Sequence, residues 1–150
     1  EQAVPFMPSE ELTPRHLRLF TPREANELLP ELIGLSASAS EGARKYRDLM
    51  VWIREEQNLD EESRMAAQED AERIREEVRM MVIQIANHGV EVKGLNPALL
   101  DFPAQREGQS VYICWREDEP RALHWHPSHE GFDGRQEILD PDNGCWEWCN

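Results

Sequence analysis

The sequence predicts an α+β fold in which a long antiparallel helical hairpin, patterned like a coiled coil, precedes a small antiparallel β unit. Apolar residues recur at intervals of three and four over residues 21–57 and again over 67–85. After Gly89 the pattern changes to the alternation of apolar and polar residues that is typical of strands. We therefore divide the chain into an arm (1–19), the helical hairpin (20–88), a β unit packed on the hairpin within the same domain (89–139) and an acidic tail (140–150).

The composition is that of a folded chain of one domain. Of its 150 residues, 31% are charged and 39% are hydrophobic. The formal net charge of −14 argues against a nucleic-acid partner, because binding to the phosphate backbone needs clustered Lys and Arg. No apolar run approaches the roughly 20 residues that span a bilayer, so we expect no membrane insertion. The first ten residues lack the pattern of a signal peptide. An odd number of cysteines, three, favours a reduced, cytoplasmic setting.

The first helix is predicted to begin at Thr21. Thr21 and Glu24 have the spacing of a capping box, in which each side chain accepts a hydrogen bond from the other residue's backbone N–H. Pro22 suits the first helical position, where no intrahelical donor is needed. The apolar stripe then continues toward Gln57, through small residues at 34–42 that would let another backbone approach closely.

The second helix is predicted to run from Glu61 to the Asn-His-Gly sequence at 87–89. Gly89 can adopt the left-handed conformation that closes a helix. Oppositely charged residues three or four apart are expected to pair along the solvated face for a few tenths of a kcal/mol each. These pairs are Glu69 with Arg73, Glu72 with Arg75 and Glu76 with Arg79.

The first helix is longer than the second, and its first half should therefore overhang. At 1.5 Å per residue the two lengths are about 54 Å and about 40 Å. The apolar residues of the overhang need cover from the C-terminal third, from a second subunit, or from both. Two indoles in the acidic tail are likewise costly to leave in water. These features favour a homo-oligomer or another protein partner, with a predicted interface of Leu28, Leu29, Leu32, Ile33, Trp146 and Trp148.

The β unit contains one clear strand, Ser110–Arg116. Alternation places Val111, Ile113 and Trp115 on one of its faces, and Tyr112 and Cys114 on the other. Residues 117–120 resemble a turn, and residues 121–126 resume an extended pattern. The best local prediction is a hairpin that joins these two runs.

Several short motifs resemble a bacterial family that is catalogued as a domain of unknown function. The resemblance covers roughly residues 19–138 and implies a helical pair followed by a short β region, with no assigned activity. In the family pattern, Trp125-His126 and the Gly-Phe-x-Gly-Arg turn are kept, whereas histidine at position 124 or 129 is not required. The motifs that carry the resemblance are Phe20-Thr21-Pro22-Arg23-Glu24-Ala25-Asn26, Asp101-Phe102-Pro103, Cys114-Trp115-Arg116, Trp125-His126 and Gly131-Phe132-Asp133-Gly134-Arg135.

A metal site is one interpretation of the histidines in the β unit. In a strand the side chains of His124 and His126 leave the same face, and Pro127 then turns the chain so that His129 or Glu130 could approach. Imidazoles with a carboxylate suit Zn or Fe(II). The alternative is that the histidines are ordinary polar residues on a sheet face.

The remaining polar candidates are Arg135 and the cysteines of the tail. Arg135 follows a glycine-shaped turn and could bind an anion, or it could pair with an internal carboxylate such as Asp101. Cys145 and Cys149 are four residues apart, which does not match common zinc motifs.

Two functions stay open. The sequence favours a non-catalytic assembly protein that uses the helical hairpin, and the alternative is a small Zn or Fe protein with its site at residues 124–130. No motif of a hydrolase or a nucleotide-binding protein is present in the sequence.

Overall fold

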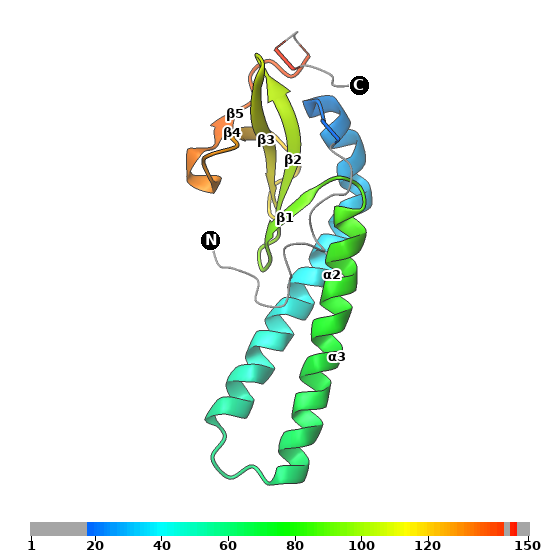
Figure 1. The fold of residues 1–150 in the computed structure, drawn as a ribbon, viewed down its shortest axis with the longest axis vertical. Coiled ribbons are helices and arrows are strands. Elements are labelled where there is room, and N and C mark those ends of the chain that lie inside the picture. The colour runs from blue at the N-terminus through cyan, green and yellow to red at the C-terminus, as the bar shows by residue number, and fades with distance from the viewer. Residues whose placement is uncertain (1–17, 143–144, 147–150) are drawn as a thin grey trace.

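The computed structural model describes residues 18–142, 145 and 146, and it confirms the predicted α+β fold (Figure 1). Two packed helices lead into an antiparallel sheet with the strand order β1-β2-β3-β4-β5. The elements are α2 (Pro22–Glu55), α3 (Glu61–Ala86), β1 (Glu91–Gly94), β2 (Leu99–Arg106), β3 (Gln109–Arg116), β4 (His124–Pro127), the 3-10 turn η1 (Phe132–Gly134) and β5 (Gln136–Glu137).

The helix boundaries follow from local chemistry. The predicted capping box is present, because the Glu24 backbone N–H donates to Thr21 Oγ1 over 3.2 Å and the Thr21 N–H donates to Glu24 Oε1 over 2.9 Å. Asp60 caps α3 by accepting from the Ser63 N–H at 2.7 Å. The chain leaves α3 through Gly89, whose φ of +88° confirms the predicted left-handed position.

The small residues of the first helix lie at a close approach between the two helices. A Cβ placed on Gly42 would overlap the side chain of Val78 in α3. Three buried side chains next to this contact, Ala39, Val78 and Val82, form a cluster between the helices. The Gly42 end of the small-residue segment therefore serves packing within the hairpin.

The overhanging half of α2 lies beside the sheet and is covered by it (Figure 1). Leu28, Leu29 and Leu32 are 8%, 2% and 0% exposed, and they belong to the main core together with Phe20 and the inner face of the sheet. The cover thus comes from the C-terminal third of the same chain. The inner-face residues of this core are Leu100, Phe102, Ala104, Val111, Ile113 and Trp115.

This cover corrects the predicted interface. The three leucines pack inside the chain, and Trp146 is only 6% exposed, so none of these side chains is available to a partner in this fold. Ile33 is 42% exposed. Trp148 lies outside the described residues.

The longest hairpin of the sheet was not predicted from the sequence. Strands β2 and β3 pair over their full length, from Leu99 opposite Arg116 to Arg106 opposite Gln109. Glu107 and Gly108 connect them with φ values of +51° and +78°, as a two-residue turn between twisted strands requires. The predicted pairing of β3 with the following run is confirmed, although that strand is confined to β4.

Two polar contacts fasten α2 to the β unit. The side-chain amide of Asn26 accepts from the Ala122 N–H at 2.8 Å and donates to the Ala122 carbonyl at 3.1 Å. Lower on the helix, the Ser40 hydroxyl donates to Glu117 Oε1 at 2.7 Å, and the Ala98 N–H donates to the same oxygen at 2.8 Å. These contacts fix the height and rotation of the sheet relative to α2.

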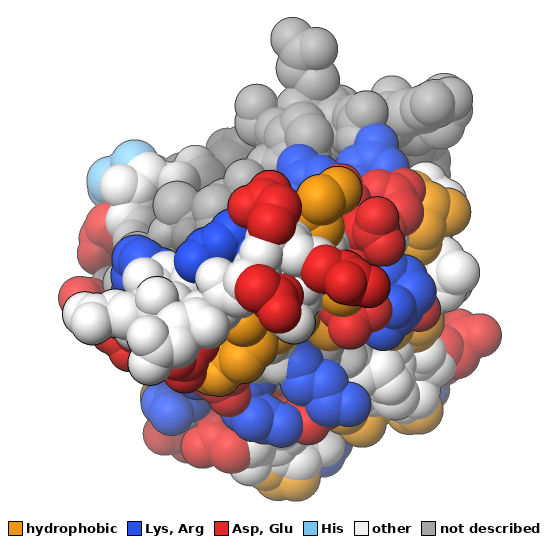
Figure 2. Space-filling view, turned by 90° about the horizontal axis from the view of Figure 1, so that it is seen from below, with side chains coloured by type: hydrophobic (Ala, Val, Ile, Leu, Met, Phe, Trp, Pro, Cys, Tyr) orange, Lys and Arg blue, Asp and Glu red, His pale blue; other side chains and the backbone are white. Residues whose placement is uncertain are grey.

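The surface of the hairpin mixes both charges, as Figure 2 shows for the end of the molecule that is seen from below. Two predicted pairs are confirmed, Arg75 with Glu72 and Arg79 with Glu76, whereas Arg73 pairs with Asp70 and not with Glu69. Within residues 18–142, neither helix combines the length and the apolar composition that a bilayer crossing requires.

Candidate metal centre

Three neighbouring strands bring Asp101, Cys114 and His126 together on the outer face of the sheet, the face turned away from the helices. Asp101 in β2 and Cys114 in β3 are register partners. His126 in β4 is opposite Tyr112, so it lies two residues along from the partner of Cys114. Because side chains alternate along a strand, all three leave the sheet on the same side.

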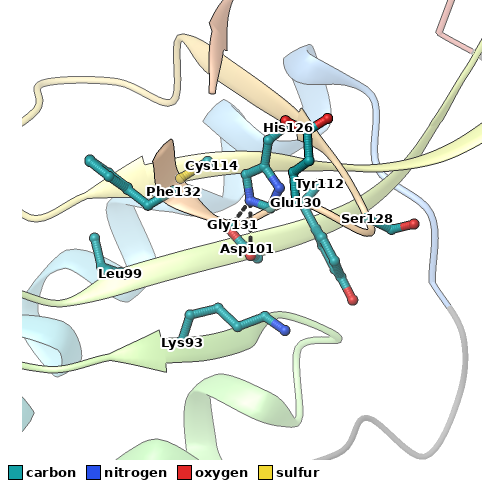
Figure 3. Close-up of a pocket in the computed structure, with 10 residues that line it drawn as sticks. All are labelled: Lys93, Leu99, Asp101, Tyr112, Cys114, His126, Ser128, Glu130, Gly131 and Phe132. Atoms are coloured by element: carbon teal, nitrogen blue, oxygen red, sulfur yellow. Dashed lines mark hydrogen bonds and ion pairs between the residues drawn. The ribbon is translucent and has the colours of Figure 1, made fainter. Parts of the chain in front are cut away.

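The donor atoms of these three residues converge on one small volume. One ligand atom from each lies within 4.8 Å of the other two. His126 Nε2 is 3.3 Å from Asp101 Oδ1 and 3.2 Å from Asp101 Oδ2 (Figure 3). The exposed fractions of Asp101, Cys114 and His126 are 4%, 2% and 3%. The cluster is therefore buried while remaining polar.

The two nitrogens of His126 have different partners. Nδ1 lies 2.9 Å from the Pro127 carbonyl oxygen, which can only accept a hydrogen bond. This contact fixes the proton on Nδ1 and turns Nε2 toward Asp101 and Cys114. Burial acts to lower the pKa of His126, but its hydrogen bonds to Asp101, Cys114 and Pro127 raise that pKa to about 10. Burial raises the pKa of the Cys114 thiol.

A pocket of about 80 Å³ opens above the cluster (Figure 3). Asp101, Cys114 and His126 line this pocket, together with side chains from β1, β2 and β3 and with the segment after β4. The other lining residues are Lys93, Leu99, Tyr112, Ser128, Glu130, Gly131 and Phe132.

The segment 128–135 covers part of this outer face. A Cβ on Gly134 would overlap the carboxylate end of Glu130. The absence of a side chain at Gly134 therefore leaves room for the Glu130 side chain at the rim of the pocket. Arg135 fastens the end of the segment, because its Nη2 donates to Glu119 Oε1 at 2.8 Å. The Arg135 guanidinium also lies over the Phe132 ring, 4.3 Å from its centroid.

The predicted cluster of His124, His126, His129 and Glu130 does not come together. Nδ1 of His124 lies 3.4 Å from Glu119 Oε2, away from the donor cluster. The His129 side chain is 80% exposed and approaches only Glu130, at 3.5 Å. Glu130 is at the pocket rim. Of the four predicted ligands, only His126 belongs to the cluster.

Asp101 and Arg135 are not partners of each other. Arg135 pairs with an internal carboxylate, as one of the two predictions held, but that carboxylate is Glu119. Asp101 instead faces His126. Of the tail cysteines, Cys145 approaches Glu107 with its sulfur 3.6 Å from Oε1, and Cys149 lies outside the described residues.

The chemistry of this arrangement differs from that of a nucleophilic triad. In a Cys-His-Asp triad the two ring nitrogens divide the work, one facing the thiol and the other the carboxylate. In this structure Nε2 of His126 faces the Asp101 carboxylate, while Nδ1 is committed to a backbone carbonyl. The two ring nitrogens therefore do not divide between the thiol and the carboxylate as they do in a triad. Convergence of three donors on one small volume is an arrangement that could hold a metal ion.

The sequence marked Asp101 and Cys114 individually, but it did not show that they are opposite each other in neighbouring strands. Both residues lie in motifs of the family resemblance, and Cys114 was placed on the face of its strand opposite the apolar one. The predicted set differs from this cluster because it took residues that are close in sequence, whereas the sheet joins residues 25 positions apart. That join depends on the hairpin of β2 and β3, whose turn at 107–108 was not recognised.

Comparison of the sequence with protein families matches the model of one family, Uncharacterized conserved protein (DUF2203), over residues 18–138. The chain belongs to this family. The matched range contains both helices, all five strands and every residue of the cluster. Comparison with curated proteins and with solved structures finds no match.

Proposed function

We propose that this member of the DUF2203 family is a metalloprotein that binds a single divalent transition metal, Zn or Fe(II), through Asp101, Cys114 and His126. The proposal rests on one observation, the convergence of one oxygen, one sulfur and one nitrogen donor within 4.8 Å of one another. The centre replaces the site predicted at residues 124–130 and keeps only His126 from it.

The spacing of the donors supports this proposal. With bonds of about 2.0–2.3 Å to zinc, the donor atoms of a tetrahedral site lie roughly 3.3–3.7 Å apart. The distance from His126 Nε2 to Asp101 Oδ2 is 3.2 Å, and the largest separation in the cluster is no more than 4.8 Å. Small rotations of these side chains would therefore bring all three donors to bonding distance.

The types of donor select the class of metal. A thiolate is a poor ligand for Mg²⁺ or Ca²⁺, which prefer oxygen, whereas a mixed set of sulfur, imidazole nitrogen and carboxylate oxygen suits Zn and Fe(II). The hydrogen bond from His126 Nδ1 to the Pro127 carbonyl is the usual support for a ligating imidazole, because it keeps one proton on Nδ1 and orients Nε2. Since the pKa of His126 is about 10 in the metal-free chain, a metal would displace the Nε2 proton when it binds.

The number of protein ligands indicates a centre of the catalytic type. Structural zinc sites commonly use four protein ligands, whereas catalytic ones use three and leave one position for water or substrate. Among the described residues the cluster supplies three, and its donors face the pocket. A metal bound there would lower the pKa of a bound water and polarise a bound substrate.

The proposal is tested by the metal content of the purified full-length chain. We expect close to one equivalent of Zn or Fe per chain, measured by inductively coupled plasma mass spectrometry after growth in medium supplied with both metals. Asp101→Ala, Cys114→Ala and His126→Ala should each lose most of this metal, because loss of one of three ligands removes a bond that the pocket cannot replace.

His129→Ala is the matched control, since its side chain is exposed and lies outside the cluster. It should retain the metal content of the wild type. A wild-type protein that contains no transition metal, and that takes up neither Zn nor Fe(II) when reconstituted, would contradict the proposal. Metal loss in His129→Ala equal to that in His126→Ala would also contradict it.

The assembly role is a separate proposal, and its candidate interface now lies on a different part of the hairpin from the one predicted. The apolar residues expected at the interface are mostly covered by the sheet, but Trp52 and Met65, near the turn between the helices, are 45% and 52% exposed. Such side chains are enriched in protein interfaces. Light scattering on the eluting peak of a size-exclusion column tests this role, and a strictly monomeric chain at micromolar concentration would contradict self-assembly.

A further inference from the structure

We infer that the open position of the proposed metal centre takes a small oxyanion of about three or four heavy atoms, such as formate or hydrogencarbonate, with Lys93 as its binding residue. This inference rests on the proposed function and names the class of ligand for the same site. It is carried by the size of the pocket, by the position of Lys93 and by the apolar wall opposite it.

The size of the pocket limits the ligand. Its volume is about 80 Å³. A buried apolar cavity of about 150 Å³ accommodates benzene, a molecule of six heavy atoms. A pocket of half that volume fits roughly three or four heavy atoms, and part of that room is needed at the metal. Drug-sized cofactors and nucleotides, which fill clefts of roughly 300–1,000 Å³, would not fit within this volume.

Lys93 supplies a cationic donor for an anion at this pocket. Lys93 and His126 are the basic side chains among the described lining residues, and His126 is a ligand in the proposed centre. Figure 3 shows the Lys93 chain lying below Asp101, with its ammonium end toward Tyr112. One of the three N–H donors is used by Glu91, whose Oε1 lies 2.9 Å from Nζ. The ammonium group also lies 4.8 Å from the centroid of the Tyr112 ring, which helps to hold it in place. Its remaining donors can face a bound oxygen.

The carboxylates near the pocket have partners of their own. Glu91 accepts from the Tyr112 hydroxyl at 2.8 Å in addition to its pair with Lys93. Glu130 stands at the rim, turned against Gly134 and 3.5 Å from His129. Asp101 is a ligand in the proposed centre. An anion bound between the metal and Lys93 would have a metal bond on one side and the free ammonium donors of Lys93 on the other.

The apolar wall favours a flat ligand. Leu99 and Phe132 line the pocket, and the Arg135 guanidinium lies 4.3 Å from the centroid of the Phe132 ring. A planar oxyanion can lay its face on this wall while its oxygens reach the metal and Lys93. A larger carboxylate, such as benzoate, would need Phe132 to move.

The test uses the full-length chain loaded with Co(II), whose visible absorption spectrum reports changes in coordination. Formate and hydrogencarbonate are titrated separately, with benzoate as the larger anion. We expect the two small anions to change the spectrum with saturation and benzoate to have no effect at the same concentrations. Lys93→Met should raise the dissociation constant for formate by about tenfold, because one charge-assisted hydrogen bond is lost.

Lys45→Met is the control variant, since Lys45 is exposed on α2 and does not line the pocket. It should bind formate as the wild type does. Failure of the wild type to bind Co(II) through a thiolate would overturn the metal centre itself. If Co(II) binds but the small anions leave its spectrum unchanged, if benzoate binds as tightly as formate, or if Lys93→Met binds formate normally, the anion site is wrong and the metal centre stands. The benzoate comparison needs only the wild type, so it decides even if a variant folds poorly.

Discussion

The two faces of the sheet are built from alternate residues of the same strands, yet they differ in chemistry. The inner face of β2 and β3 carries Phe102 and Ile113, both fully buried against the helices. The outer face carries Asp101 and Cys114, which are buried almost as completely beneath the segment 128–135. At these positions both faces bury their side chains, the inner face with apolar residues and the outer face with titratable ones at the base of the pocket.

This difference separates stability from binding. Apolar side chains are buried at a gain in free energy, whereas buried polar groups need partners to offset their lost hydration. On the outer face the offset comes from the pair of His126 with Asp101 and from the Pro127 carbonyl. Substitutions on the inner face should therefore act on the free energy of unfolding, and those on the outer face on ligand binding.

The largest effect on stability is expected for Phe102→Ala. Phe102 is fully buried and packs edge-to-face on Phe20, with ring centroids 5.3 Å apart. Its loss should reduce the free energy of unfolding by about 3–5 kcal/mol, measured by urea denaturation. The outer-face variant Cys114→Ala, in metal-free protein, should lose about 1 kcal/mol or less because it removes one small group. Equal losses in the two variants would contradict the proposed division between the faces.

A smaller effect is expected for Asn26→Ala, which breaks the fastening of α2 to the β unit. The variant leaves the backbone N–H and carbonyl of Ala122 without their side-chain partner. We expect a loss of about 1–3 kcal/mol in the same denaturation experiment. Asn58→Ala, at an exposed position in the turn between the helices, should change the value by less than about 0.5 kcal/mol. Similar values for both variants would show that Asn26 does not fasten the helix.

The ion pair that fastens the outer cover predicts a pH dependence. Burial acts to raise the pKa of Glu119, but hydrogen bonds from Arg135 and the Arg116 backbone N–H more than offset it and hold that pKa below its usual value of 4.5. The charged carboxylate therefore stabilises the fold above about pH 4.5, and this contribution is lost as the pH falls through the lowered pKa.

Glu119→Gln should remove this contribution. The difference in the free energy of unfolding between wild type and variant should be greatest near pH 7 and should shrink below about pH 4.5. Urea denaturation of wild type and variant, at pH 7 and at a pH below about 4.5, measures this difference. A difference that grows as the pH falls would have the wrong sign for a carboxylate with a lowered pKa.

The smallest effect is expected on the hairpin surface, which belongs to neither face of the sheet. Asp70 pairs with Arg73 at 2.7 Å, but both side chains are more than half exposed. Asp70→Ala should change the free energy of unfolding by less than about 0.5 kcal/mol, because water and salt screen such pairs. A loss above 1 kcal/mol would mean that this surface is covered in solution, as an assembly role would require.

Local signals in the sequence were enough to predict the helical hairpin and the faces of β3. The capping box at Thr21, the closing Gly89 and the alternation over residues 110–116 each depend on neighbours along the chain. The cover of Leu28 and its neighbours could not be decided, because a second subunit and the C-terminal third satisfy the same apolar pattern. The donor cluster could not be assembled from the sequence for a related reason. His126 was found from its motif, but its companions come from two other strands, and no local pattern fixes the register between strands.

The most direct test of the central claim is X-ray absorption at the zinc edge of the zinc-loaded chain. The proposed centre predicts one sulfur at about 2.3 Å and nitrogen or oxygen donors at about 2.0–2.1 Å. In Cys114→Ala the sulfur contribution should disappear. A wild-type spectrum with only nitrogen and oxygen donors, or a sulfur contribution that persists in Cys114→Ala, would contradict the assignment of Asp101, Cys114 and His126 as a metal centre.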